Sequence, residues 1–437
     1  MKERLPAPLF KSDARTMPQA AALLARLAAD PDQLLVLLEL QRLLLRRIRS
    51  RERFALRARM LSRALQKKLR NDRPSKDVAN DLRLRQSACE SNLEQARYSI
   101  FLWKCFGDGA ACVYQSPYNL KHLLYDQNYQ VKQEAGFITG KEGLLREWAI
   151  LEHGIQAGVP VVLSDLTNMI RYGDVCALAA ADPVPIEVKS SANSGSRVVR
   201  QAQLLDELMS FYENDGAKEF RGIPNVTRQA IASGPSYADL MNQCIAQALQ
   251  NGSAMANPEP GLHYLVGATE DGLDRFMSQL VSPMKVYRLL TPTPNWLPCL
   301  PFTLTLKPEN LMAFLTGAVT VLVVIDMPHL KGLFRKYGSH ATMMMDGTWA
   351  IQLCVNPDNL LEGVFRVSEL HFARVGLEFQ SLEWFAKENA IDLSEPVTSM
   401  TKEEFEAQPL NTVWTTVPED WKAVRDFYDS GQLGHEP

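Results

Sequence analysis

Two acidic residues and a lysine lie on short hydrophobic segments within residues 173–191, GDVCALAAADPVPIEVKSS. Asp174 precedes one apolar run, and Glu187 and Lys189 follow in a second run, after a turn that contains proline. A charged side chain on a buried strand is costly to remove from water unless a partner neutralises it. The segment is therefore either a hairpin with solvated edges or a site where these groups converge on a metal ion.

The residue types suit a divalent cation. Side chains alternate along a strand, so Glu187 and Lys189 share one face, while Val188 points into the core and its carbonyl remains at the strand edge. Two carboxylates, a carbonyl and water form the oxygen-rich ligand set that Mg²⁺ or Mn²⁺ prefers. We expect Asp174, Glu187 and the Val188 carbonyl to bind the metal, and Lys189 to orient a water or offset phosphate charge.

The surrounding segment has the pattern of an α/β unit. A helical pattern in KEGLLREWAILEHGIQAG (141–158) is followed by strand-like runs in VPVVLSD, GDVCALA and PIEVKSS. The segment VVRQAQLLDELMSFYEND (198–215) is again an amphipathic helix. The predicted order is helix, three strands, helix.

The hairpin resembles the PD-(D/E)xK signature of restriction-endonuclease-like nucleases. Gly173-Asp174 is followed, after twelve intervening residues, by Glu187-Val188-Lys189, and Gly173 stands where the signature has proline. An isolated ExK is a weak signal, but the acid at this spacing and the apolar strands make the combination more specific. The resemblance implies a restriction-endonuclease-like αβββα core.

The preceding helix strengthens this resemblance. It is similar to the first helix of Holliday-junction-resolvase-type nucleases, in which a glycine is followed four residues later by a glutamate and eleven residues after that by a helix-ending glycine. Gly143, Glu147 and Gly158 have this spacing. The resemblance covers about residues 140–215, and it implies that Glu147 binds a metal-bound water or a second metal ion.

The resemblance also implies an activity. Such proteins are Mg²⁺- or Mn²⁺-dependent nucleases that hydrolyse phosphodiester bonds, here most simply in DNA as an endo- or exodeoxyribonuclease. Lys189 would position the attacking water. The helix after the strands often supplies a basic or glutamine side chain, and the candidates for this contact are Arg200, Gln201 and Gln203.

Two alternatives for the ligands stay open. Asp165, at the end of the first predicted strand, competes with Asp174, which could instead cap a turn. Glu152 competes with Glu147, because Glu152 falls in the apolar stripe of its helix whereas Glu147 borders that stripe. Glu187 and Lys189 could also form a solvated ion pair of little consequence.

A basic stripe is the strongest feature of the N-terminal region. Residues 17–105 have helical periodicity almost throughout, with a break at NDRPSK (71–76). Residues 41–73 contain 13 Lys and Arg but two acids. Such a stripe is usually a solvated helix face. The excess charge also suits phosphate contacts, for which we name Arg46, Arg49 and Arg53.

The whole chain has an ordinary composition. Its 437 residues carry a net charge of −3, and its seven cysteines form no CxxC pair, which argues against a disulfide framework or a zinc knuckle. GKEG (140–143) lacks the spacing of a phosphate-binding loop. The apolar segment 311–325 is short for a bilayer and contains a glycine, so a helix end followed by a buried strand is expected. We expect a cytoplasmic protein without membrane contact.

Three domains are predicted: a helical, Arg-rich region at 1–115, a nuclease-like domain at 116–250 and a C-terminal α/β domain at 260–437. Without a motor motif, any ATPase or sensor function would come from a protein partner, as in bacterial anti-phage defence effectors. The runner-up function is a catalytically inactive nuclease fold that binds nucleic acid or protein in a larger assembly. The helical region could also be an assembly module, and a homo-oligomer is an open alternative.

Overall fold

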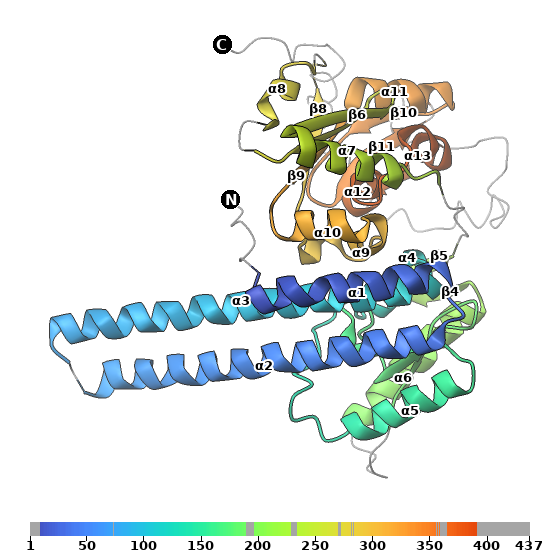
Figure 1. Cartoon of the computed structure of the whole chain (residues 1–437). Coiled ribbons are helices and arrows are strands. Elements are labelled where there is room, and N and C mark those ends of the chain that lie inside the picture. Colours follow the sequence, from blue (N-terminus) through green and yellow to red (C-terminus); the bar gives the residue numbers. More distant parts are fainter. Residues whose placement is uncertain are drawn as a thin grey trace. The chain divides into compact units, whose positions relative to one another are not determined.

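The computed structural model shows a mixed α/β protein with an N-terminal helical region and small antiparallel sheets (Figure 1). The chain forms two compact units, residues 1–232 with 291–318 and residues 233–290 with 319–437. The structure describes residues 9–72, 74–188, 196–228, 234–269, 272–280, 282, 284–354, 356, 358 and 365–390.

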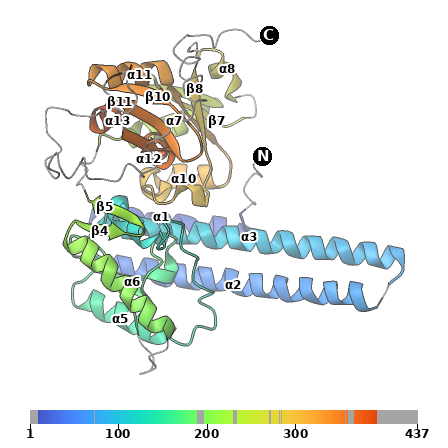
Figure 2. The ribbon, with the colours of Figure 1, turned by 180° about the vertical axis from the view of Figure 1, so that it is seen from behind.

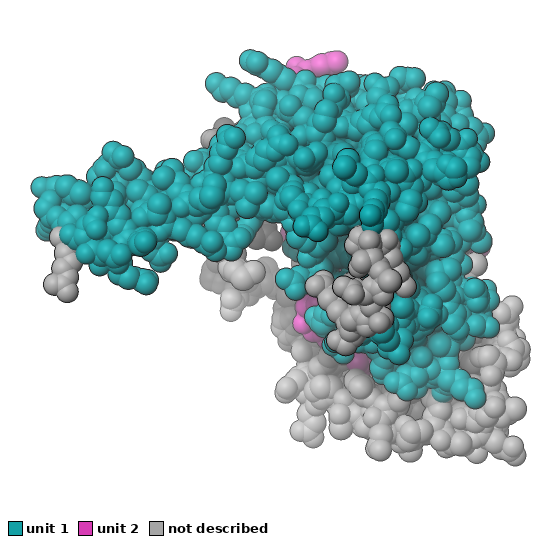
Figure 3. All heavy atoms as spheres, turned by 90° about the horizontal axis from the view of Figure 1, so that it is seen from below, with its two compact units in different colours: residues 1–232, 291–318 teal, residues 233–290, 319–437 magenta. Residues whose placement is uncertain are grey.

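Three helices form the N-terminal part of the first unit: α1 (Lys11–Ala29), α2 (Leu34–Asn71) and α3 (Lys76–Tyr114). Helices α2 and α3 run antiparallel, and their joined ends extend beyond the rest of this unit as an arm (Figures 1 and 3). The break between them coincides with the predicted break at NDRPSK. On α2, apolar residues at helical spacing are buried, among them Leu37, Leu40, Leu44 and Ile48.

Part of the basic stripe is structural. Asp13 of α1 is fully buried and accepts hydrogen bonds from Arg47 and Arg51 of α2 at 3.1 and 2.7 Å. The Ser99 hydroxyl of α3 also donates to Asp13. These two arginines therefore join helices in the interior, and only the remaining arginines of the stripe are available as a solvated or nucleic-acid-binding face.

A three-stranded antiparallel sheet follows α5 (Leu144–Gln156) and precedes α6 (Ser196–Glu213). Its strands, in the order β1-β2-β3, are Val161–Leu163, Val175–Ala177 and Val184–Ile186. The predicted order of helix, three strands and helix is thus observed.

Helix α2 completes the edge of this sheet. The buried Gln41 side chain donates to the Val161 carbonyl and accepts from the Leu163 N–H, both at 2.9 Å. A strand edge presents unpaired backbone groups that must find partners when they are buried. The sheet is therefore attached to the helical region by paired hydrogen bonds, which explains why the two segments belong to one unit.

The first unit contains several shorter elements. A hairpin after α6 packs Phe211 against Phe220 with ring centroids 4.0 Å apart. The elements are α4 (Pro117–Leu120), η1 (Lys121–Leu123), η2 (Ser164–Leu166), β4 (Gly216–Phe220), β5 (Ile223–Thr227), η4 (Pro294–Trp296), α9 (Phe302–Thr305) and α10 (Pro308–Leu315).

The second unit contains a four-stranded antiparallel sheet and a three-stranded one, with helices around them (Figure 2). The first sheet has the order β6-β7-β9-β8, and the strands are Ser253–Glu259, Leu262–Gly267, Thr320–Asp326 and Lys285–Leu290. The second has β10 (His340–Met343), β11 (Trp349–Cys354) and β12 (Phe365–Ser368). The helices are α7 (Ala238–Asn251), α8 (Asp274–Met277), α11 (Met327–Lys336), α12 (Glu369–Leu377) and α13 (Leu382–Asn389).

The apolar segment 311–325 spans the end of α10 and most of β9, as expected. Residues Val321–Ile325 of β9 are buried. Across the ranges that the structure describes, no helix combines the length and the apolar character needed to cross a bilayer.

The two units divide the chain differently from the three predicted domains. The helical region at 1–115 and the segment 116–232 lie together in the first unit. Residues 291–318, predicted to belong to the C-terminal domain, also lie in the first unit, and the second unit begins at residue 233. Local sequence patterns do not reveal this arrangement, because it depends on contacts between distant segments.

Candidate functional site

Three carboxylates meet at one lysine. The Nζ atom of Lys141 lies 3.0 Å from Oε1 of Glu147, 2.9 Å from Oδ2 of Asp165 and 3.0 Å from Oδ1 of Asp174. We call Glu147, Asp165 and Asp174 the acid cluster. The ammonium of Lys141 thus marks a position at which the structure concentrates negative charge around a cation.

The sheet brings two of these acids together. Asp165 lies in η2, directly after β1, and Asp174 directly precedes β2. Leu163 pairs with Val175 in the antiparallel ladder, and the Ser164 N–H donates to the Asp174 carbonyl at 3.0 Å. Because the end of one strand faces the start of its antiparallel neighbour, both carboxylates emerge at the same edge.

Helix α5 supplies the third acid from its first turn. Glu147 is only 2% exposed, and a side chain at Gly143 would place its Cβ 2.9 Å from Glu147 Oε1. The glycine of the predicted Gly-x₃-Glu spacing therefore leaves room for the carboxylate. The second oxygen of Glu147, Oε2, is buried and has no hydrogen-bond partner in the described structure.

The end of β3 is held against Asp174. The Asp174 N–H donates to the Ile186 carbonyl at 2.9 Å, and Asp174 Oδ2 accepts from the Val188 N–H at 2.9 Å. Glu187 lies between these two contacts in the chain, and its carboxyl group interacts with that of Asp174. The two acids of the sequence signature are therefore neighbours in space.

The electrostatics of the site reflect its excess of negative charge. Burial raises the pKa of Glu147, although Lys141 partly offsets this effect. Burial, followed by the charge of Asp174, raises the pKa of Glu187, although part of its side chain is exposed. Burial alone would lower the pKa of Lys141, but Asp165 and the other acids raise it. Neighbouring carboxylates of this kind favour binding of a cation or a proton.

The structure distinguishes between the competing acids of the sequence. Glu147 belongs to the acid cluster, whereas Glu152 pairs with Arg42 of α2 at 2.7 Å on the surface. Asp165 and Asp174 both belong to the cluster, so they are not mutually exclusive.

The arginine candidates and Gln203 lie outside the cluster. Arg200 is exposed and donates to Gln127 at 3.3 Å, and Gln203 is exposed on α6. Arg46 and Arg53 are exposed on α2, and Arg49 is partly buried. Lys189 and the side chain of Gln201 lie outside the described residues.

Two lysines at the site were not predicted. Lys141 belongs to GKEG (140–143), which was considered only as a phosphate-binding loop and was excluded as such. The sequence signal that could have indicated Lys141 is its position six residues before Glu147. Lys132 lies 3.4 Å above the Tyr172 ring. Burial lowers its pKa to about 8, although the nearby charge of Glu187 acts in the opposite direction. Lys132 therefore adds positive charge next to the signature acids.

The donor atoms of the site suit a hard divalent cation. All are carboxylate oxygens, which Mg²⁺ and Mn²⁺ prefer, and Glu147 Oε2 has unused acceptor capacity. In the part of the chain that the structure describes, no group of three or more His, Cys, Asp or Glu is arranged to hold a metal ion with its side chains as they lie. Lys141 is placed among the acids that would bind such an ion.

Comparison of the chain with known protein families, with curated proteins and with solved structures gave no match.

Proposed function

We propose that this protein is a metal-dependent nuclease that hydrolyses phosphodiester bonds in DNA, with the acid cluster and Glu187 as its active site. The observation that carries the proposal is the convergence of Glu147, Asp165 and Asp174, from three separate segments, on one cation position. A protein that needed only a surface ion pair would not bury Glu147 with one oxygen unpartnered.

Each residue has a specific role in this proposal. Asp174, Glu187 and the Val188 carbonyl would hold Mg²⁺ or Mn²⁺, and Glu147 and Asp165 would add further carboxylate oxygens. When bound, the metal would lower the pKa of a water molecule and neutralise negative charge on the phosphate. Lys189 would orient the attacking water, and Lys141 would offset charge on the phosphodiester.

Cleavage assays test the proposal directly. Plasmid and single-stranded DNA are incubated with the protein and Mg²⁺, Mn²⁺ or EDTA, beside Glu147→Gln, Asp174→Asn and the surface control Glu213→Gln, an exposed glutamate of α6. We expect EDTA to abolish cleavage and the two cluster variants to lose at least about 100-fold, since loss of an outer-shell partner alone costs 10–100-fold at metal sites. Equal cleavage by wild type and Asp174→Asn would contradict the assignment.

A second candidate function has its own supporting observation. Lys141 already forms an ion pair with each acid of the cluster, as a permanent counter-ion would in a catalytically inactive nuclease fold that binds nucleic acid or protein. Calorimetry with Mn²⁺ separates the two. A nuclease binds Mn²⁺ in the wild type and loses this binding in Asp174→Asn. An inactive scaffold binds no Mn²⁺, and Lys141→Met destabilises it by leaving buried carboxylates without a partner.

The wider setting of the protein belongs to the same proposal. The sequence has no GxxxxGK[ST] motif, so we propose that a protein partner supplies any ATPase or sensor function. A cytoplasmic location, a role as an anti-phage defence effector and homo-oligomerisation are parts of the proposal to be tested after cleavage itself.

A further inference from the structure

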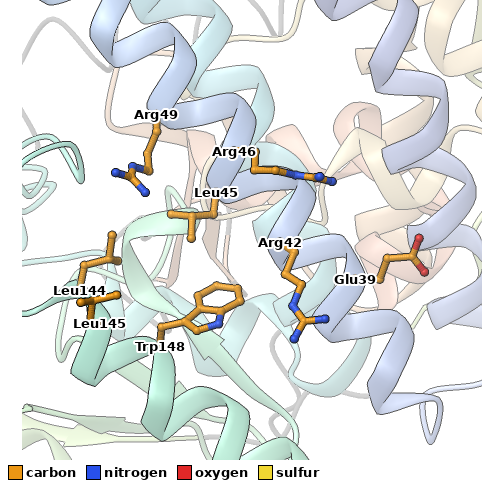
Figure 4. A pocket seen from close by; sticks show the side chains of 8 residues that line it. All are labelled: Glu39, Arg42, Leu45, Arg46, Arg49, Leu144, Leu145 and Trp148. Atoms are coloured by element: carbon orange, nitrogen blue, oxygen red, sulfur yellow. The ribbon is translucent and has the colours of Figure 1, made fainter.

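A pocket of about 370 Å³ lies between α2 and α5, and none of the residues of the acid cluster lines it (Figure 4). Its volume is within the range of small-molecule sites. Its lining joins three arginines and one acid to apolar side chains: Arg42, Arg46, Arg49, Glu39, Leu45, Leu144, Leu145 and Trp148. A ligand that fits this lining combines a flat apolar surface with negative charge.

Trp148 is held at the pocket wall by a neighbouring ion pair. Glu152 accepts hydrogen bonds from Arg42 at 2.7 Å and from the Trp148 side chain, and these bonds, that of Arg42 first, lower the pKa of Glu152. This network links α2 to α5 and fixes the indole. A fixed aromatic ring is a ready platform for stacking, because little side-chain freedom is lost on binding.

Arg49 supplies positive charge that no acid among the described residues neutralises. Its side chain extends from α2 towards the α5 side of the pocket (Figure 4). Its Nε is shielded from solvent and has no hydrogen-bond partner in the described structure. Among the described residues, neither Arg49 nor Arg46 forms an ion pair. A buried donor without a partner favours binding of an acceptor such as a phosphate oxygen.

We propose that this pocket binds one nucleotide of single-stranded DNA, with its base against Trp148 and the leucines and its phosphate at Arg49. Base faces are accessible in a single strand and are covered by stacking in a duplex, so an aromatic platform selects single strands. The inference rests on the proposed nuclease function. Glu147 and Trp148 are consecutive on α5, so the same turn of this helix contributes to the acid cluster and to the pocket.

Binding is measured without metal, so that cleavage plays no part. Fluorescence anisotropy of a labelled ten-nucleotide oligothymidylate in EDTA is compared for wild type, Arg49→Gln, Trp148→Leu and Trp148→Phe. The matched charge control is Arg26→Gln, an exposed arginine of α1 outside the pocket. We expect Arg49→Gln and Trp148→Leu to weaken binding by about 10-fold or more, as base–aromatic stacking predicts.

The controls determine what the result means. Trp148→Phe keeps an aromatic face and retains affinity within about threefold of wild type, which separates stacking from a loss of folding. A duplex of equal length is insensitive to Trp148→Leu. Equal weakening by Arg49→Gln and Arg26→Gln would overturn the pocket in favour of general electrostatic attraction, as would equal loss of duplex binding in Trp148→Leu. If DNA binding depends on the pocket residues but no metal-dependent cleavage occurs, the nuclease proposal is overturned and the pocket proposal stands.

Discussion

Gly173 stands where the nuclease signature has proline, and its backbone explains this difference. Its φ is +69°, in the left-handed region that glycine adopts without steric cost. Proline is fixed near −65° and cannot adopt this conformation. A Cβ at this position would also lie 2.7 Å from the Ile186 backbone nitrogen. Glycine therefore allows β3 to approach Asp174 closely enough for their backbones to pair.

Replacement of Gly173 by alanine should destabilise the protein more than the same change at Gly140. Both glycines have positive φ, which costs an alanine about 1–2 kcal/mol. A Cβ at Gly140 has no atom within 4 Å, whereas one at Gly173 meets the backbone of β3. We expect an additional loss of about 1–3 kcal/mol at Gly173, typical of overpacking. Urea unfolding of both variants measures the difference, and equal losses would contradict the close approach of β3.

Helix α3 positions the segment that carries Asp165. The buried Asp108 accepts hydrogen bonds from the backbone N–H groups of Asn168 and Met169 at 2.7 and 2.9 Å. Beside it, a Cβ at Gly107 would lie 2.0 Å from the Leu166 carbonyl oxygen, so only glycine permits this contact between helix and loop. The loop of the acid cluster is therefore fixed from behind by a helix that is distant in the sequence.

Asp108 should make stability depend on pH. Burial raises its pKa from 3.8 to about 6, although the hydrogen bonds of Asn168 and Met169 limit the rise. The folded state thus binds this proton more tightly than the unfolded state. Its contribution to stability is fully present below pH 4 and is lost as the pH rises through 6. Over this pH range, the loss of the Asp108 proton lowers the free energy of unfolding by roughly 3 kcal/mol.

The variant Asp108→Asn tests this dependence, because it keeps a neutral side chain of the same shape. From pH 4 to pH 7, its free energy of unfolding should rise relative to that of the wild type by roughly the same amount. Urea unfolding at each pH unit gives the comparison. Parallel curves for the two proteins would show that Asp108 does not titrate in this range.

At the scale of the molecule, the arginines of the basic stripe fall into two groups, one inside the first unit and one exposed on α2. Arg47 and Arg51 are used inside the first unit, in contact with Asp13. Further along α2, towards its end at Asn71, Arg57, Arg59 and Arg63 are exposed. A row of exposed arginines on a projecting helix could contact the phosphates of a duplex, or it could be a solvated face.

The salt dependence of duplex binding separates these two alternatives. We compare wild type with the triple variant Arg57→Gln, Arg59→Gln and Arg63→Gln by measuring binding constants over a range of salt concentrations. If all three contact phosphates, the slope of log K against log salt becomes shallower by about 2.7, because each contact contributes about 0.9. An unchanged slope would show that the arm is a solvated face.

Local pattern alone was enough to predict much of the first unit. Hydrophobic periodicity predicted the long N-terminal helices, their break at residues 71–76 and the order of helix, three strands and helix, because these features depend on neighbouring residues. Two spacings, Gly143 to Glu147 and Asp174 to Glu187, indicated three acids as candidate site residues. The structure places these acids in one region. The nuclease activity inferred from that spacing stays a prediction.

The partner of each charge was decided only by the tertiary structure. Lys141 among the acids, Arg47 and Arg51 against Asp13, and Gln41 at the edge of β1 are contacts between separate segments. The same is true of the assignment of residues 291–318 to the first unit. Burial selects these partners, since a polar group removed from water must be satisfied by whichever residue the fold brings to it. That selection leaves no periodic signal in the sequence.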